Sequence, residues 1–278
     1  MLTESCMQDY RDGGRAIVRA ADYAYILPHP GLLQSISNYS ITFPYPGMMS
    51  ESYTIMPHGS ATLVFSANES GVRSRLFGPM SKPVCVGHEA NLCGLLFIVE
   101  FQPAGYYAFS GIPQREMTDV VLDFRDVNSS LCSLLSREIE FSQRLDELIA
   151  RVDRLFLAHL KPGCYQQGFS QASRMIVDSG GLISVGALSE EVFYSERHLN
   201  RLFGEYVGVG TKAFSRLVRV NKAMRLLHRP SSGLLQTCLD TGFYDMPHFI
   251  RDFKSICGVT PQEFRDNMSD FYSEIAKF

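Results

Sequence analysis

The sequence predicts a multidomain α+β protein with a β-rich front part and an all-α C-terminal part containing two helix-turn-helix units. Between residues 10 and 127, Pro and Gly repeatedly separate short runs of β-branched and aromatic residues. After Asn128, Pro and Gly are absent until Pro162, and apolar residues recur at helical spacing. From Phe169 onward the pattern is helical, and one short motif occurs twice. The length of 278 residues fits two ordinary domains.

The composition, with 45% hydrophobic and 20% charged residues, is typical of a soluble globular protein. No apolar run approaches the roughly 18 residues of a membrane span. The N-terminus lacks the basic start and apolar stretch of a signal peptide. We therefore expect a cytoplasmic protein without membrane contact.

Seven cysteines, an odd number without a C-x-x-C pair, favour reduced core thiols over a disulfide framework. Only Cys85 and Cys93, eight residues apart, could form a sensing pair. Neither has His or Cys partners at the spacing of a closed zinc site. We expect no metal and no cofactor.

The front part, residues 1–127, predicts a barrel or sandwich, because many short strands alternate with turns. The clearest strand patterns are residues 61–65 and 95–101. Residues 128–167 then predict a helical linker that begins at Asn128, a good N-cap residue. Within it, Phe141, Leu145, Leu148, Val152 and Leu155 follow an a/d spacing. This spacing predicts either a dimerisation helix or a helix packed on its own domain.

Residues 168–278 predict the helical domain, in which the first helix-turn-helix unit is defined by its caps. Ser184 can cap a helix that runs to Val192, and Ser195 can cap the next one after only two residues. In this recognition helix the apolar residues fall on one side, and the polar residues that remain outside are Glu196, Arg197, Asn200 and Arg201. Arg can hold a guanine edge and Asn an adenine edge through two hydrogen bonds, so this face suits the major groove.

A long helix over residues 211–228 is predicted to join the two units. From Arg197 to Arg229 there are eight basic residues and one acid, Glu205. Such a charge either attracts duplex phosphates or forms a solvated helix face.

The recognition helix recurs about 50 residues later. Ser195, His198, Leu199, Arg201 and Phe203 correspond in spacing to Asp245, His248, Phe249, Arg251 and Phe253. The repetition predicts that both copies have the same function.

Residues 169–267 resemble the DNA-binding domain of the AraC/XylS family of bacterial transcription regulators. The stretches that carry the resemblance are Ala187–Val192, Ser195–Phe203, Arg219–Leu227, Thr241–Asp245 and Phe253–Arg265. It implies contacts with double-stranded DNA, RNA polymerase as a partner, and no enzymatic activity. It places base-contacting residues at Arg197, Asn200, Arg201, Met246, Pro247, Ile250 and Arg251. We expect Ser195, Glu196 and Lys254 to contact DNA as well.

Two departures from the family pattern make the units unequal. The second recognition helix offers Met246, Pro247 and Ile250 where polar residues are usual, and Phe193 stands in the first turn where Gly is frequent. We expect the first unit to carry most of the hydrogen-bonded specificity, and the second to contact thymine methyls or respond to DNA shape.

The front part is similar to a β-rich, cupin-like barrel found in some of these regulators, which implies effector binding or dimerisation. The similarity rests on residues 27–28, 57–65, 77–79 and 101–105. Candidate polar ligands of a small-molecule effector are His58, Arg73, Arg75, His88 and Glu100. Two alternatives stay open: a front part that only forms a homodimer, and an enzymatic or thiol-reactive domain fused to the DNA-binding domain.

Overall fold

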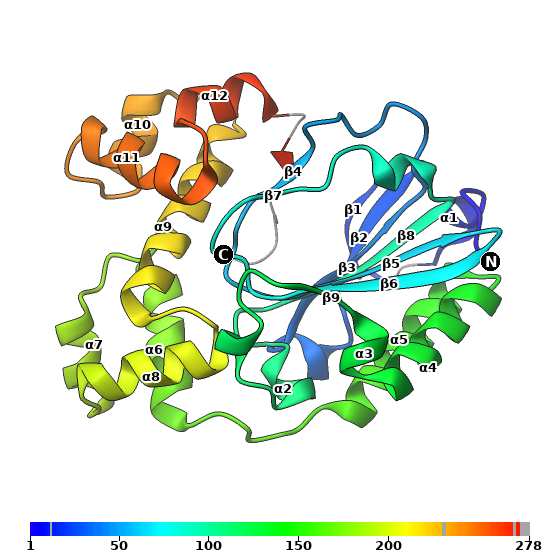
Figure 1. Ribbon diagram of the computed structural model, residues 1–278, viewed down its shortest axis with the longest axis horizontal. Coiled ribbons are helices and arrows are strands. Elements are labelled where there is room, and N and C mark those ends of the chain that lie inside the picture. The colour runs from blue at the N-terminus through cyan, green and yellow to red at the C-terminus, as the bar shows by residue number, and fades with distance from the viewer. Residues whose placement is uncertain (12, 230–231, 269–270, 273–278) are drawn as a thin grey trace.

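The computed structural model describes residues 1–11, 13–229, 232–268 and 271–272, which form a β-rich domain and an all-α domain side by side (Figure 1). Among the described residues, the β-rich domain has nine strands: β1 (Ala16–Arg19), β2 (Tyr23–Ile26), β3 (Ile36–Thr42), β4 (Thr54–Ile55), β5 (Thr62–Asn68), β6 (Gly71–Phe77), β7 (Val84–Cys85), β8 (Leu95–Phe101) and β9 (Val121–Asp123). Its helices are α1 (Cys6–Asp9), α2 (Tyr107–Ser110), α3 (Phe124–Val127), α4 (Ser129–Phe141) and α5 (Leu145–His159), with short 3-10 turns at Pro30–Leu32, Glu89–Leu92 and Gln114–Glu116. The two-domain α+β arrangement predicted from the sequence is confirmed.

Seven of these strands form one sheet in the order β1-β2-β3-β8-β5-β6-β9, with antiparallel neighbours. Because β1 and β9 are edge strands with a single partner each, the described sheet is open. The expected closed barrel, and with it the cupin-like detail, is therefore not confirmed. A second small sheet joins β4 to β7 and to β10 (Phe271–Tyr272), a strand that follows the helical domain.

Helices α4 and α5 cover one face of the large sheet (Figure 1). Leu135 and Ile139 of α4, and Leu148 and Val152 of α5, are buried in the same core as Tyr39, Phe65 and Phe97 of the strands. Residues 129–159 thus share their core with the front part, which favours the alternative of helices packed on their own domain.

The a/d series is interrupted between its first two members. Phe141 is the last residue of α4, Ser142 is extended, and Leu145 is the first residue of α5. Leu145, Leu148 and Val152 face the domain's own core, whereas Phe141 is 65% exposed. One continuous dimerisation seam along this series is therefore excluded.

The helical domain consists of α6 (Gln167–Asp178), α7 (Val185–Val192), α8 (Glu196–Tyr206), α9 (Thr211–Leu227), α10 (Leu234–Asp240), α11 (Met246–Cys257) and α12 (Pro261–Asp266). The predicted caps are observed: Ser184 accepts from the Ala187 amide and Ser195 from the His198 amide, at 3.1 and 3.2 Å. The first unit is therefore formed as predicted.

The two domains are in direct contact through α9 and the segment between β4 and β5. Met56 is buried among Leu217, Val220 and other residues of the second unit. The side-chain amide of Asn221 donates to the Pro57 carbonyl at 3.0 Å and to the Leu217 carbonyl at 2.8 Å. Farther along, the Thr118 hydroxyl donates to the Gly208 carbonyl at 2.9 Å. The β-rich domain thus holds the helix that joins the two units.

Replacing Phe193 by Gly should stabilise the protein. Phe193 is 92% exposed and has φ of 56°, a left-handed conformation that costs an L-residue about 1–2 kcal/mol. Gly removes this strain but adds chain entropy to the unfolded state. We expect the free energy of unfolding to rise by about 0.5–1 kcal/mol in chemical denaturation.

Tyr244 provides the matched control, because it is equally exposed in the turn of the second unit and is absent from the residues with positive φ. Tyr244→Gly should lower the free energy of unfolding. A gain of similar size in both variants would contradict the strain at Phe193.

Candidate nucleic-acid interface

The first recognition helix, α8, buries one side and exposes the other, as its sequence predicts. Leu199, Leu202 and Phe203 are fully buried. Ser195, Glu196, Arg197, Asn200 and Arg201 are all exposed. The structure therefore brings the five predicted residues of this unit to one accessible surface.

Two of these side chains are also engaged within the protein. Oδ1 of Asn200 accepts a hydrogen bond from the Thr211 amide, at the start of α9, at 3.2 Å. Nη1 of Arg201 donates to Oε2 of Glu205 at 3.0 Å. Arg197 forms no ion pair with the described residues, so it is the basic side chain of this face that is free to contact a base.

The second recognition helix, α11, has the same frame with a different surface. Asp245 accepts from the His248 amide at 2.7 Å, and Phe249 and Phe253 are fully buried. Pro247, Ile250, Arg251 and Lys254 are exposed, and Met246 is half-buried. The outward face is apolar at its start and basic farther on, as the sequence predicts.

Helix α9 carries its basic residues in three different environments. Arg216 pairs with Asp252 of α11 at 3.0 Å. Arg219 donates to the Gly181 carbonyl at 2.7 Å and lies over the ring of Phe243 at 5.4 Å. These two arginines therefore hold the helix-turn-helix units together.

Lys222 and Arg225 instead line a hollow of about 130 Å³ between α6 and α9. Within the described residues neither forms an ion pair, although Asp178 also lines the hollow. Burial, with repulsion from Arg229, lowers the pKa of Arg225, and its Nε is buried without a hydrogen-bond partner. Two unpaired cations in a hollow suit an oxyanion such as a phosphate group. The sequence showed their charge but not that they are unpaired.

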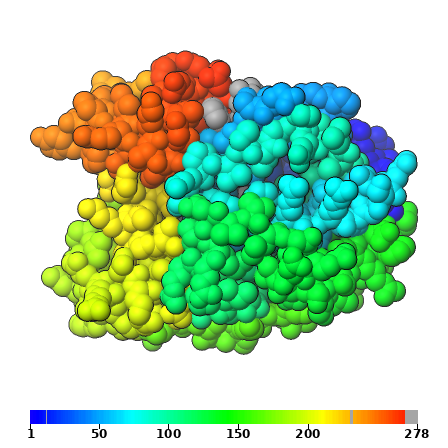
Figure 2. Space-filling model, in the orientation of Figure 1, coloured from blue at the N-terminus to red at the C-terminus, as the bar shows by residue number. Residues whose placement is uncertain are grey.

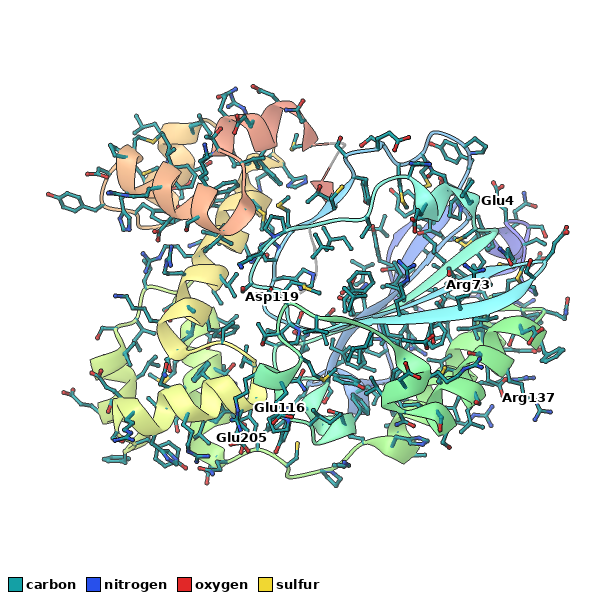
Figure 3. The ribbon with its side chains drawn as sticks, viewed as in Figure 1. Glu4, Arg73, Glu116, Asp119, Arg137 and Glu205 are labelled. Atoms are coloured by element: carbon teal, nitrogen blue, oxygen red, sulfur yellow. The ribbon has the colours of Figure 1, made fainter. Side chains whose placement is uncertain are left out.

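The five effector candidates of the front part do not form one cluster of accessible groups. His58 and Glu100 are buried: Nδ1 of His58 lies 3.0 Å from the Ser60 hydroxyl, and Glu100 accepts from the Thr62 hydroxyl at 2.7 Å. His88 is exposed and lies 2.7 Å from a Glu51 carboxylate oxygen. Arg73 and Arg75 are exposed on β6, and Arg73 is labelled in Figure 3.

Arg73 and Arg75 lie on the face of the sheet opposite to α4 and α5, because their neighbours Ser74 and Leu76 point toward those helices. Val64 and Ser66 of β5 pair with them across the strands and share this face. Figure 2 shows the surface hollowed between the cyan atoms of β5 and β6 and the teal atoms of the segment after β7. This face is the part of the front domain where several polar and apolar side chains remain accessible.

The helical domain is similar in sequence to domains of known proteins. A family described as a helix-turn-helix domain matches residues 188–267. The regulator ArgR of Pseudomonas aeruginosa, named an HTH-type transcriptional regulator, is 30% identical over 84 residues, which are 30% of this chain and 26% of ArgR. Residues 188–267 are thus similar to the helix-turn-helix domain of known transcriptional regulators. An uncharacterised HTH-type regulator of Staphylococcus aureus is 35% identical over 83 residues, 11% of its own length.

The match to the curated regulators is thus confined to the helix-turn-helix domain, and the chain spans about a quarter or less of their length. A second family, described as a domain of unknown function, matches residues 24–123. Among solved structures, ToxT from Vibrio cholerae aligns with 78% of this chain and 95% of its own, at 12% identity and a TM-score of 0.44. A ToxT structure with bound unsaturated fatty acid aligns at 13% identity and a TM-score of 0.40, covering 88% of this chain and 90% of its own.

No helix in the described part of the chain is long and apolar enough to cross a membrane.

Asn200→Ala should destabilise the DNA-free protein, because the Asn200 side chain caps the first turn of α9. Loss of a cap of this kind costs about 1 kcal/mol. Chemical denaturation of the full chain measures the change. Arg197→Ala on the same face should stay within about 0.5 kcal/mol of the parent, and equal effects of the two substitutions would refute the capping role.

Proposed function

We propose that this protein is a DNA-binding transcription regulator that places α8 and α11 in successive stretches of the major groove. The proposal is carried by one observation: two recognition helices with matching caps and buried sides expose different outward faces and are joined by a single helix that packs on both. Two rigidly joined helices favour one continuous duplex site over two independent ones. The protein acts where the DNA is, in the cytoplasm.

Base contacts are assigned to the exposed side chains of both recognition helices and to the half-buried Met246. In the first unit these are Arg197, Asn200 and Arg201, with Ser195 and Glu196 at the helix start. In the second unit they are Met246, Pro247, Ile250, Arg251 and Lys254. Arg and Asn provide directed hydrogen bonds, whereas Met, Pro and Ile provide apolar contact with thymine methyls. Lys222 and Arg225 bind a backbone phosphate, which fixes position without selecting sequence.

The proposal is tested with a duplex that the wild-type chain enriches from a randomised pool (the selected duplex) and a shuffled duplex of the same composition. Arg201→Ala should lower discrimination between them about 5- to 100-fold, the value of one good bidentate base contact. Arg251→Ala should lower it less. Equal losses would overturn the asymmetry between the units, and failure to enrich any duplex would overturn the function itself.

Lys222→Gln provides the matched control for a backbone contact. It should weaken binding to both duplexes by the same factor and reduce the salt dependence of log Kd by about 1. A change in discrimination would contradict a phosphate contact at Lys222.

The N-terminal domain is proposed to bind a small-molecule effector on the accessible face of the sheet, where Arg73 and Arg75 provide positive charge and Val64 an apolar surface. Such a mixture of apolar and few polar groups is usual in ligand sites. A thermal-shift screen of the full chain should find carboxylate-bearing ligands that stabilise the wild type. Arg73→Ala should abolish the shift, and the exposed Arg137→Ala on α4 should retain it. Persistence of the shift in Arg73→Ala would exclude this site.

The homodimer and the contact with RNA polymerase expected from the family resemblance also stay proposals. Phe141 and Leu134 are exposed on α4 and support a surface for a second copy of the chain.

A further inference from the structure

The guanidinium of Arg201, to which the proposed function assigns a base contact, is held within α8. Its partner Glu205 lies one helical turn later, and the two groups are 3.0 Å apart. A guanidinium holds a guanine edge with two N–H groups. The ion pair occupies Nη1, so DNA must displace Glu205 before Arg201 can use its full set of donors.

Glu205 is in turn held by the β-rich domain. The Tyr107 hydroxyl, on α2, donates to Oε1 of Glu205 at 3.4 Å. The ring of Tyr107 packs edge-on against Tyr206, with centroids 4.7 Å apart. Figure 3 labels Glu205 at the end of α8 that lies beside α2. The two oxygens of one carboxylate therefore join Tyr107 of the β-rich domain to Arg201 of the helical domain.

Tyr107 stays a hydrogen-bond donor under physiological conditions. Burial, and secondarily the negative charge of Glu205, raise the pKa of Tyr107. The hydroxyl therefore keeps its proton throughout the neutral range.

The second unit provides an internal comparison for this arrangement. Arg251 corresponds to Arg201, but the residue four positions later is Ser255 and not an acid. The Ser255 hydroxyl instead accepts from Arg216 at 2.8 Å. No carboxylate within the described ranges forms an ion pair with Arg251. The restraint is specific to the first unit.

We propose that Glu205 is a specificity-determining residue that competes with DNA for Arg201, and that Tyr107 places this competition under the control of the β-rich domain. The inference rests on the proposed function. While α2 is docked, Tyr107 holds Glu205 in place and Arg201 is restrained. When α2 moves away, Glu205 loses one of its two partners, and Arg201 is released more easily to contact a base. Because exposed ion pairs are weak, the restraint adjusts discrimination without abolishing binding.

Glu205→Gln in the full chain tests the competition. Its Kd for the selected duplex should fall about three- to tenfold. Loss of one negative charge near DNA improves binding to any duplex, so the ratio of Kd values for the shuffled and selected duplexes isolates the effect on Arg201. This ratio should rise in Glu205→Gln.

Glu191→Gln is the matched control, because Glu191 is an exposed acid of α7 without an ion pair among the described residues. It should change binding to both duplexes equally and by less than about twofold. Identical behaviour of Glu205→Gln and Glu191→Gln would overturn the inference while DNA binding itself remains intact. Failure of the wild type to bind the selected duplex would instead overturn the proposed function.

Two double variants test whether Tyr107 acts on Arg201 through Glu205. Tyr107→Phe should increase discrimination about two- to threefold in the wild type and leave it unchanged in Glu205→Gln. Glu205→Gln should leave discrimination unchanged in Arg201→Ala. Independent effects of Tyr107→Phe and Glu205→Gln would refute control by the β-rich domain. Equal thermal midpoints of the variants establish that they fold alike.

Discussion

The arrangement of the helical domain depends on α9, which belongs to both hydrophobic cores at once. Phe214 and Val218 of α9 are buried with the first unit, while Val220, Ala223, Met224 and Leu227 are buried with the second. A helix of 17 residues is stiff on this scale, and its two ends cannot turn independently without opening a core. The spacing of the two recognition helices is therefore set by packing and not by a flexible linker. The contact of Met56 and Pro57 with the same helix extends this constraint to the β-rich domain.

Helices with local signals could be predicted from the sequence almost residue by residue. Ser184, Ser195 and Asp245 accept hydrogen bonds from amides three residues later, and each of these bonds is determined by residues close in the chain. The path of the large sheet could not be predicted in this way. Strand β8 lies between β3 and β5, so its pairing depends on residues more than 25 positions away. The short strand patterns carry no information on whether such a sheet closes.

The helices after Asn128 show why periodicity alone is insufficient. Leu145, Leu148 and Val152 have the spacing of a dimer seam, and the same spacing serves a helix packed on a sheet. What decides between them is the partner surface, here formed by Tyr39 and Phe97 of distant strands. The outward residues of α8 and α11, apart from the half-buried Met246, are exposed as the sequence predicts, because burial there follows the helical period. The bond from Asn200 to Thr211 could not be inferred, since it depends on how α9 leaves the turn.

The interaction of Arg201 with Glu205 depends both on spacing along the sequence and on a contact made by the fold. Their spacing of four residues is visible in the sequence and suits an ion pair on a helix, whereas the approach of Tyr107, 98 residues away, exists only in the fold. An exposed ion pair contributes at most about 1 kcal/mol, while one bidentate base contact contributes about 1–3 kcal/mol. DNA of the right sequence therefore displaces Glu205, but DNA offering a poorer contact does not. A weak internal competitor thus reduces the free energy that the first unit gains from the right sequence, while the apolar face of α11 and the cations of α9 maintain position on the duplex. The two units therefore differ in function: the first discriminates between DNA sequences, and the second holds the protein in position on the duplex. The β-rich domain contacts the first unit.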